Sequence, residues 1–217
     1  RKPTLVSNVT HIAVSDIMNG VTKKLAGSYS LSTVPLLANT ISNIFEYLDL
    51  QPDQQTDSYK GNDKILQTTV DSIMANLIPG IDPVILSSAT FSGRIEREEA
   101  RRLRNTVIRV DGMNANITTN ITLPEFEQNL FGSTQVLFEG YQSVGLKAII
   151  GPNPFKKLKA SENVTTPVLS LSFVREDGTT YSITNLTNPL IFELPIPEGL
   201  DLSIANLNES EAGFRPV

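Results

Sequence analysis

Apolar residues in the first third of the chain recur at the three- and four-residue spacing of amphipathic helices. Three such stripes follow one another: Ala13, Ile17, Val21 and Leu25; Val34, Leu37, Ile41, Ile44, Phe45 and Leu48; and Leu66, Val70, Ile73 and Leu77. Gly27 is placed to end the first helix, Ser32 or Thr33 to cap the second, and Pro79-Gly80 to stop the third. The polar residues 51–63 are typical of a loop. We therefore expect three helices, each of which must bury its apolar stripe.

The hydrophobic period changes to two after Pro83, as expected where a chain passes from helices to a sheet. The alternation predicts strands at 84–86, 91–95, 106–110, 116–123, 135–139, 145–150, 168–175, 179–184, 190–196 and 200–204. Asp177-Gly178 supplies the positive φ angles of a tight primed turn, which predicts an antiparallel hairpin around it. The densely charged residues 97–102 indicate a solvated face or loop, and the proline- and lysine-rich residues 151–167 a surface loop.

Helices precede strands without β-α alternation, and this order predicts an α+β fold. We expect a small N-terminal helical subdomain at 1–80, packed on an antiparallel β-sandwich at 81–217. A chain of 217 residues buries roughly 70% of its unfolded surface, so it can form a core without disulfides or metals. Its apolar runs fall far short of the ~20 residues that cross a bilayer, so we expect no membrane-spanning segment.

Charge and cysteine content narrow the classes of function. The chain has 18 Lys+Arg against 23 Asp+Glu, a net charge of −5, and no dominant basic block, which argues against nucleic acid as a partner. The absence of cysteine excludes disulfides, zinc-thiolate sites and thiol catalysis. The chain begins at Arg1 without an initiator Met or an apolar leader, so we expect a mature chain or an excised piece.

The N-x-S/T acceptor pattern of N-glycosylation indicates an extracellular location. It occurs at Asn8, Asn116, Asn120, Asn163, Asn185 and Asn208, about twice as often as the Asn, Ser and Thr content supplies by chance. Strand alternation places Ile117, Ile121 and Leu123 on one face, so that Asn116 and Asn120 point to solvent, where a glycan fits. The alternative is that these Asn and Thr are ordinary solvent-facing residues. We expect an extracellular or cell-surface protein with N-linked glycans.

Candidate catalytic residues are few. The G-x-S-x-G, Walker A, G-x-G-x-x-G and H-E-x-x-H patterns are all absent. His11 is the single histidine, and neither a nucleophile nor an orienting carboxylate can be assigned to it from sequence. The acidic residues Glu96, Glu98, Glu99, Glu125 and Glu127 are interleaved with Arg or fall on expected exposed faces. We therefore expect no catalytic residue, no cofactor and no metal site.

Two ligand-binding alternatives remain open. Asp49, Asp53, Asp57 and Asp63 surround the expected polar loop and offer oxygen ligands to calcium, although EF-hand spacing is absent. The arginines at 94, 97, 101, 102, 104 and 109 are a candidate clamp for an anionic glycan, with nearby glutamates cancelling part of their field.

Two segments of the sequence resemble a known family. Residues 65–95, ILQTTVDSIMANLIPGIDPVILSSATFSGRI, and residues 178–197, GTTYSITNLTNPLIFELPIP, are similar to GAIN domains of polycystin-like and receptor-for-egg-jelly-like surface proteins. In the second segment, Asn185-Leu186 and Asn188-Pro189 precede an amphipathic strand that closes on proline. The resemblance extends over roughly residues 13–197.

The resemblance implies a domain that lies outside the cell, before a membrane-spanning region. Such domains often end in a proteolysis motif with Cys pairs, Trp and a His-Leu-Ser/Thr triplet, in which the hydroxyl attacks the preceding carbonyl. This chain has no Cys and no Trp, and His11-Ile12-Ala13 is not that triplet. We therefore expect the chain to be inert towards self-cleavage.

Our leading hypothesis is a non-enzymatic, GAIN-like ectodomain module that acts as an adhesive or mechanical scaffold. The implied partners are a C-terminal membrane part, neighbouring ectodomains and a polycystin-type channel subunit. One alternative is a secreted structural component of an extracellular filament or appendage, which self-assembles through exposed sheet edges. An alternative of another class is a carbohydrate-binding module or glycosidase, which would need convergent carboxylates in a cleft.

Overall fold

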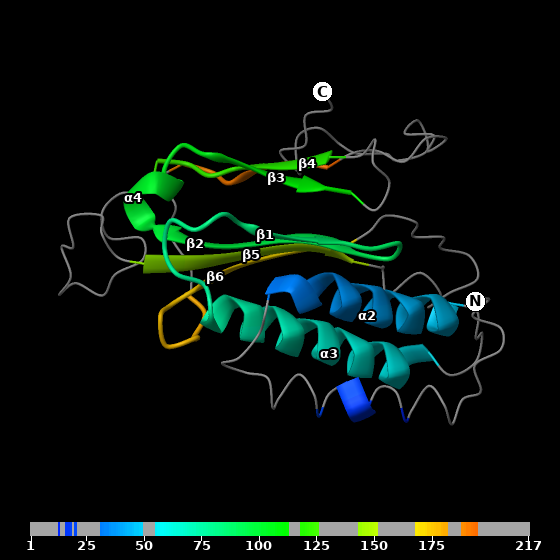
Figure 1. Ribbon diagram of the computed structural model, residues 1–217. Helices are drawn as coiled ribbons and strands as arrows, with labels where there is room; N and C mark the ends of the chain where they lie inside the picture. The colour runs from blue at the N-terminus through cyan, green and yellow to red at the C-terminus, as the bar shows by residue number, and fades with distance from the viewer. Residues whose placement is uncertain are drawn as a thin grey trace, which may run out of the picture.

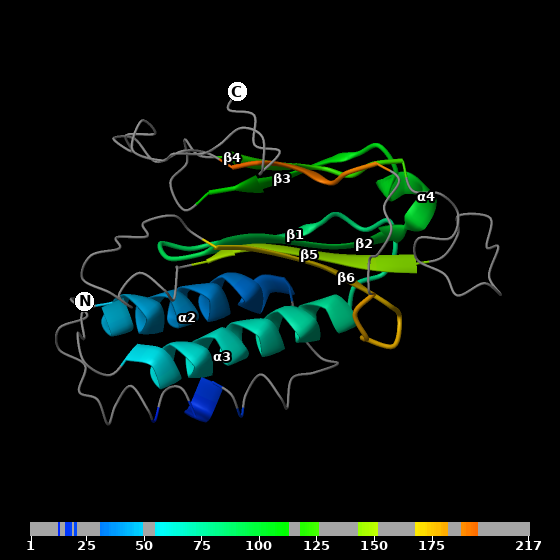
Figure 2. The same ribbon diagram turned by 180° about the vertical axis from the view of Figure 1, so that it is seen from behind.

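The computed structural model describes residues 13, 16–18, 20, 31–49, 55–112, 118–125, 143–151, 168–181 and 188–194. They form three layers: two long helices, a four-stranded sheet against which the helices lie, and a three-stranded sheet on the opposite side (Figures 1 and 2). All strand pairs are antiparallel. The predicted α+β fold, with N-terminal helices packed on a sandwich, is thereby confirmed.

The second and third predicted helices are present as an antiparallel pair (Figure 1). A short 3-10 helix, η2 (Leu31–Thr33), leads into α2 (Val34–Asp49), and α3 (Gln55–Ala75) follows. The described members of both predicted stripes are buried: Val34, Leu37, Ile41, Ile44 and Phe45 of α2, and Leu66, Val70 and Ile73 of α3. Leu77 is also buried, in the turn after α3, where its N–H donates to the carbonyl of Met74 at 3.2 Å.

Two helix predictions are wrong in detail. The predicted loop 51–63 is largely helical, because α3 begins at Gln55. The first two turns of α3 lack an apolar stripe, so the hydrophobic periodicity of the sequence did not predict them. In the first helical segment the buried side chain is Met18, whereas Ala13 and Ile17 of the predicted stripe are exposed, Ile17 by 63%. The packed face is therefore turned by about one position, or 100°.

The middle layer, called here the inner sheet, has the order β1-β2-β5-β6. Its strands are β1 (Val84–Ser87), β2 (Ser92–Glu99), β5 (Ser143–Gly151) and β6 (Val168–Val174). The charged run 97–102 does not form a loop, because β2 continues to Glu99 and the short helix α4 (Ala100–Leu103) follows. In Figure 1, α4 lies at the end of the sandwich, where the chain passes from one sheet to the other.

The outer sheet has the order β3-β4-β7. Its strands are β3 (Val107–Asp111), β4 (Thr118–Thr122) and β7 (Ile191–Glu193). The registers Arg109↔Asn120 and Asn120↔Glu193 place three side chains in a row across the sheet. β7 is only three residues long and is exposed throughout, whereas β3 and β4 alternate between buried and exposed positions.

The predicted hairpin after β6 exists, with a different turn. Val174 pairs antiparallel with Thr180, and the N–H of Arg175 donates to the carbonyl of Thr179 at 2.8 Å. Gly178 has φ +85°, and Asp177 is not among the residues with positive φ, so a primed turn is excluded. The N–H of Gly178 instead donates to the Arg175 carbonyl at 3.1 Å, which places the left-handed glycine at the end of a four-residue turn.

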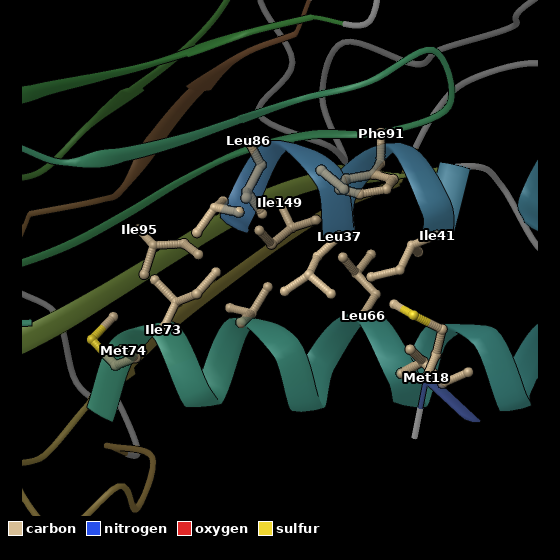
Figure 3. Close-up of a cluster of buried hydrophobic side chains, with 14 of the residues drawn as sticks. Met18, Leu37, Ile41, Leu66, Ile73, Met74, Leu86, Phe91, Ile95 and Ile149 are labelled. Carbon is tan, nitrogen blue, oxygen red and sulfur yellow. The ribbon is translucent and has the colours of Figure 1, made fainter. Parts of the chain in front are cut away.

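Two hydrophobic cores lie on opposite faces of the inner sheet. The first lies between this sheet and the helices, and its members include Ile41, Leu66, Phe91, Ile95 and Ile149 (Figure 3). The second lies between the two sheets and includes Ile108, Val110 and Ile121 of the outer sheet. β5 contributes to both, with Ile149 on the helix side and Leu146, Ala148 and Ile150 on the other.

Predicted strands 135–139 and 200–204 and the predicted loop 151–167 fall outside the described residues, apart from Gly151 in β5. The chain passes from helix to sheet between Ala75 and Val84. The helices share a continuous core with the inner sheet, and the division at residue 80 stays a prediction.

Candidate functional site

Strand β4, which carries the sequon residue Asn120, has its polar side chains on the outer face of the outer sheet. In β4, Thr119 and Ile121 are buried, and Thr118, Asn120 and Thr122 on the other face are partly exposed. Leu123, the next inward position, is fully buried. This alternation is the one predicted from the sequon pattern. Asn8, Asn116, Asn163, Asn185 and Asn208 lie outside the described residues.

Asn120 is held by its neighbour on β7. Its Nδ2 donates a hydrogen bond to Oε2 of Glu193 at 2.8 Å, and its Oδ1 is buried without a hydrogen-bond partner. A carboxylate accepts from the amide NH2 and repels the amide oxygen, which fixes the orientation of the Asn120 amide. One edge of Asn120 is therefore engaged by Glu193, and its other edge is closed to solvent.

Four of the five charged residues of β2, Arg94, Glu96, Glu98 and Glu99, form ion pairs with each other or with α4. Arg94 donates from Nε and Nη2 to Oε2 of Glu96 at 2.9 and 2.7 Å, and the side chain of Glu96 is only 12% exposed. Arg101 contacts Glu99 at 2.8 Å, and Arg102 lies 3.5 Å from Glu98. The prediction of a solvated face is wrong for Arg97, which is buried in β2, whereas Arg101 and Arg102 of α4 are exposed.

The burial of Arg97 differs most from the solvent exposure that its charge predicts. Arg97 is 94% buried on the helix side of β2, since its exposed fraction is 6%. Its Nη1 donates to Oγ of Ser143 at 3.3 Å, and its Nη2 lies 3.5 Å from the carbonyl oxygen of Met74 in the last turn of α3. Among the described residues it forms no ion pair. The alternation of Phe91, Ile95 and Arg97 on one face was the sequence signal for this burial.

Burial lowers the pKa of the Arg97 guanidinium from its usual value, because desolvation penalises the charged form. The negative charge of Glu176 partly opposes this effect. The carbonyl ends of α3 carry partial negative charge, which favours a cation at this position. Arg97 therefore acts as a structural tie between the end of α3, β2 and the start of β5.

The remaining candidate residues do not converge. The six arginines of the candidate clamp are spread over several surfaces. Arg94 and Arg97 point to opposite faces of β2, Arg101 and Arg102 lie on α4, Arg104 follows directly after α4, and Arg109 is exposed on the outer sheet. Such a distribution does not form a clamp for one anion.

The acidic residues are equally dispersed. Asp49 is the last residue of α2, whereas Asp57 and Asp63 lie in α3, six residues apart. Glu125 and Asp63 are exposed, and His11, Asp53 and Glu127 lie outside the described residues. No group of three or more His, Cys, Asp or Glu suited to a metal ion occurs within the described part of the chain.

Within the same residues, no helix has the length and apolar character needed to cross a membrane. Comparison with models of known protein families and with curated protein sequences finds no match for this chain.

Proposed function

We propose that this protein is a non-enzymatic extracellular glycoprotein module, a GAIN-like ectodomain that acts as an adhesive or mechanical scaffold. The observation that carries this proposal is the outward amide and hydroxyl face of β4, formed by Thr118, Asn120 and Thr122. A strand that buries its apolar residues and carries its sequon residues on the opposite, partly exposed face suits a secreted chain. The three-layer fold provides the packed framework that a scaffold requires.

The placement of charged groups also favours a scaffold over an enzyme. Glu96, Glu98 and Glu99, three acidic residues within four positions, each contact an arginine. A glycosidase needs two carboxyl groups about 5–10 Å apart across an open cleft, one of which is free to donate a proton. The ion pairs of β2 do not offer that arrangement. The implied partners are glycans, neighbouring ectodomains, a C-terminal membrane part and a polycystin-type channel subunit.

The experiment that tests this proposal is intact-mass analysis of the protein from its native source, before and after treatment with an N-glycosidase. We expect a mass loss that maps to one or more of Asn8, Asn116, Asn163, Asn185 and Asn208. The purified chain should also stay intact over days of incubation. An unmodified protein in the cytosol, or spontaneous scission at one bond, would overturn the proposal.

The edge of the inner sheet favours self-assembly as a second candidate function. β1 ends this sheet, carries no charged residue, and exposes Ile85 by 51%. Uncharged edge strands are templates for pairing with another chain. Sedimentation velocity of the wild type and of Ile85→Lys tests this candidate: we expect assemblies that the lysine abolishes, and a concentration-independent monomer in both would contradict it.

A further inference from the structure

Asn120, on the outer face of the outer sheet, has two roles that compete with each other. It is the acceptor of an N-glycosylation sequon and also the only residue of β4 with a side-chain hydrogen bond to β7 among the described contacts. We propose that an N-glycan on Asn120 and the docking of β7 exclude each other, so that modification of Asn120 controls whether β7 joins the outer sheet. The occurrence of this modification in the native protein rests on the proposed extracellular function.

The attachment of β7 is slight. Three register pairs join it to β4, namely Asn120↔Glu193, Ile121↔Phe192 and Thr122↔Ile191. All three residues of β7 are exposed, Ile191 by 51% and Phe192 by 43%. With so little apolar burial, β7 is held by the backbone ladder of these three pairs and by the hydrogen bond from Asn120 Nδ2 to Glu193 Oε2.

The chemistry of the modification conflicts with this contact. Glycosylation converts the primary amide of Asn120 to a secondary amide and removes one of its two N–H donors. Secondary amides are trans, so the sugar carbon lies on the same side of the C–N bond as Oδ1. Oδ1 of Asn120 has no access to solvent in the folded molecule. The sugar therefore requires space that the docked arrangement does not provide, and the side chain must swing away from Glu193.

Asn120 is synthesised before β7, so glycosylation can precede the docking of β7. Glu193 lies 73 residues after Asn120, so the acceptor emerges from the ribosome before the strand that protects it. A chain modified early therefore folds with β7 undocked, whereas a chain that escapes modification closes the outer sheet. The same sequence yields two forms of the sheet edge.

The test uses the full chain, secreted from eukaryotic cells behind a heterologous signal sequence. Site-resolved glycopeptide mass spectrometry gives the occupancy of Asn120, and hydrogen–deuterium exchange of residues 188–194 reports the docking of β7. We expect protection of these amides in every chain with a free Asn120 and loss of that protection in every chain with a glycan there. Chains that carry the glycan and keep β7 protected to the same extent would overturn the proposal.

Two matched variants on β4 separate this sequon from its neighbour. Thr122→Val removes the sequon of Asn120, and Thr118→Val removes that of Asn116 by the same chemical change on the same face of the strand. We expect the first variant to give a single population with β7 protected. The second should leave the occupancy of Asn120 and the exchange of β7 as in the wild type. Equal effects of both variants on β7 would contradict the proposal.

A second measurement is independent of the secretory pathway. Because the chain has no cysteine, Asn120→Cys introduces a single thiol to which a sugar can be coupled in the purified protein. Coupling should release β7 relative to the uncoupled variant, while coupling at Thr118→Cys should not. An unchanged exchange rate after coupling at position 120 would overturn the exclusion. Absence of glycans at the other five sequons of the native protein would instead overturn the proposed function.

Discussion

The two cores on either side of the inner sheet differ in how completely they are closed. The helix-side core is covered by α2 and α3 and contains the fully buried rings of Phe45 and Phe91, packed edge to face with centroids 6.3 Å apart. Among the described residues, the core between the sheets is covered by the three strands of the outer sheet and by α4, and Phe192 at its edge is 43% exposed although it lies on the same face as the buried Ile121. We infer from this difference that the helices and the inner sheet form the firm unit, and that the outer sheet opens at a lower free energy.

The largest expected effect is a loss of stability in the unit formed by the helices and the inner sheet. Phe91→Ala should lower the free energy of unfolding by about 3–5 kcal/mol, because it leaves a cavity beside Phe45 where no solvent enters. Urea denaturation followed by circular dichroism measures the loss. The control is Ile85→Ala on β1, whose side chain is half exposed and whose loss should stay within about 0.5 kcal/mol. Equal losses in the two variants would mean that the helix-side core is not as described.

The next effect concerns the outer sheet alone. Ile121→Ala removes a fully buried side chain of β4 and should destabilise the outer sheet by about 2 kcal/mol or more. We expect faster hydrogen exchange in β3 and β4, while α3 keeps its protection. A uniform loss of protection in α3 and β4 would show that the two units unfold together, contrary to the comparison.

A glycine on β5 controls how closely α3 approaches the inner sheet. A Cβ on Gly145 would lie 2.5 Å from Sδ of Met74, so Gly145→Val should cost about 1–3 kcal/mol by forcing the helix and the sheet apart. Gly151→Val, on the same strand with nothing within 4 Å of the added Cβ, is the matched control and should change stability little. Met74→Ala should recover part of the loss in the double variant. Failure of this recovery would place the strain elsewhere.

The smallest effect is a pH dependence at the hairpin tip. The hydroxyl and the N–H of Thr179 donate to Oδ1 of Asp177 at 2.6 and 2.9 Å, and these bonds lower the pKa of Asp177 below its ordinary value of 3.8. A lowered folded-state pKa gives stability that is present above pH 3.8 and is lost as the pH falls through the folded value. Asp177→Asn should therefore lower Tm slightly at neutral pH, with the difference disappearing in acid. A Tm difference that grows in acid would refute this sign.

Much of the helix-side core was predictable from sequence. The stripes of α2 and α3 and the inner-sheet strands follow from periodicity alone, because local spacing determines which face is apolar. Arg97 shows where this reasoning stops. Its charge indicated solvent, but its position on the same face as Ile95 and the arrival of the end of α3 decided its burial. The contact with the end of α3 is a tertiary contact, and the local spacing of apolar residues does not predict it.

The candidate site was predictable only in part. The outward direction of Asn120 followed from the alternation of β4. Its partner did not, because Glu193 is 73 residues away and β7 is too short to fix its register by pattern. The beginning of α3 at Gln55 was missed for a related reason, since a helix turn without apolar residues has no stripe to detect.

Native-state hydrogen exchange at low concentrations of denaturant compares the stability of the helix-side unit with that of the outer sheet. We predict that amides of α3 and β5 exchange only through global unfolding, while those of β3, β4 and β7 exchange through a partial opening of lower free energy. One common free energy for both sheets and the helices would contradict the account.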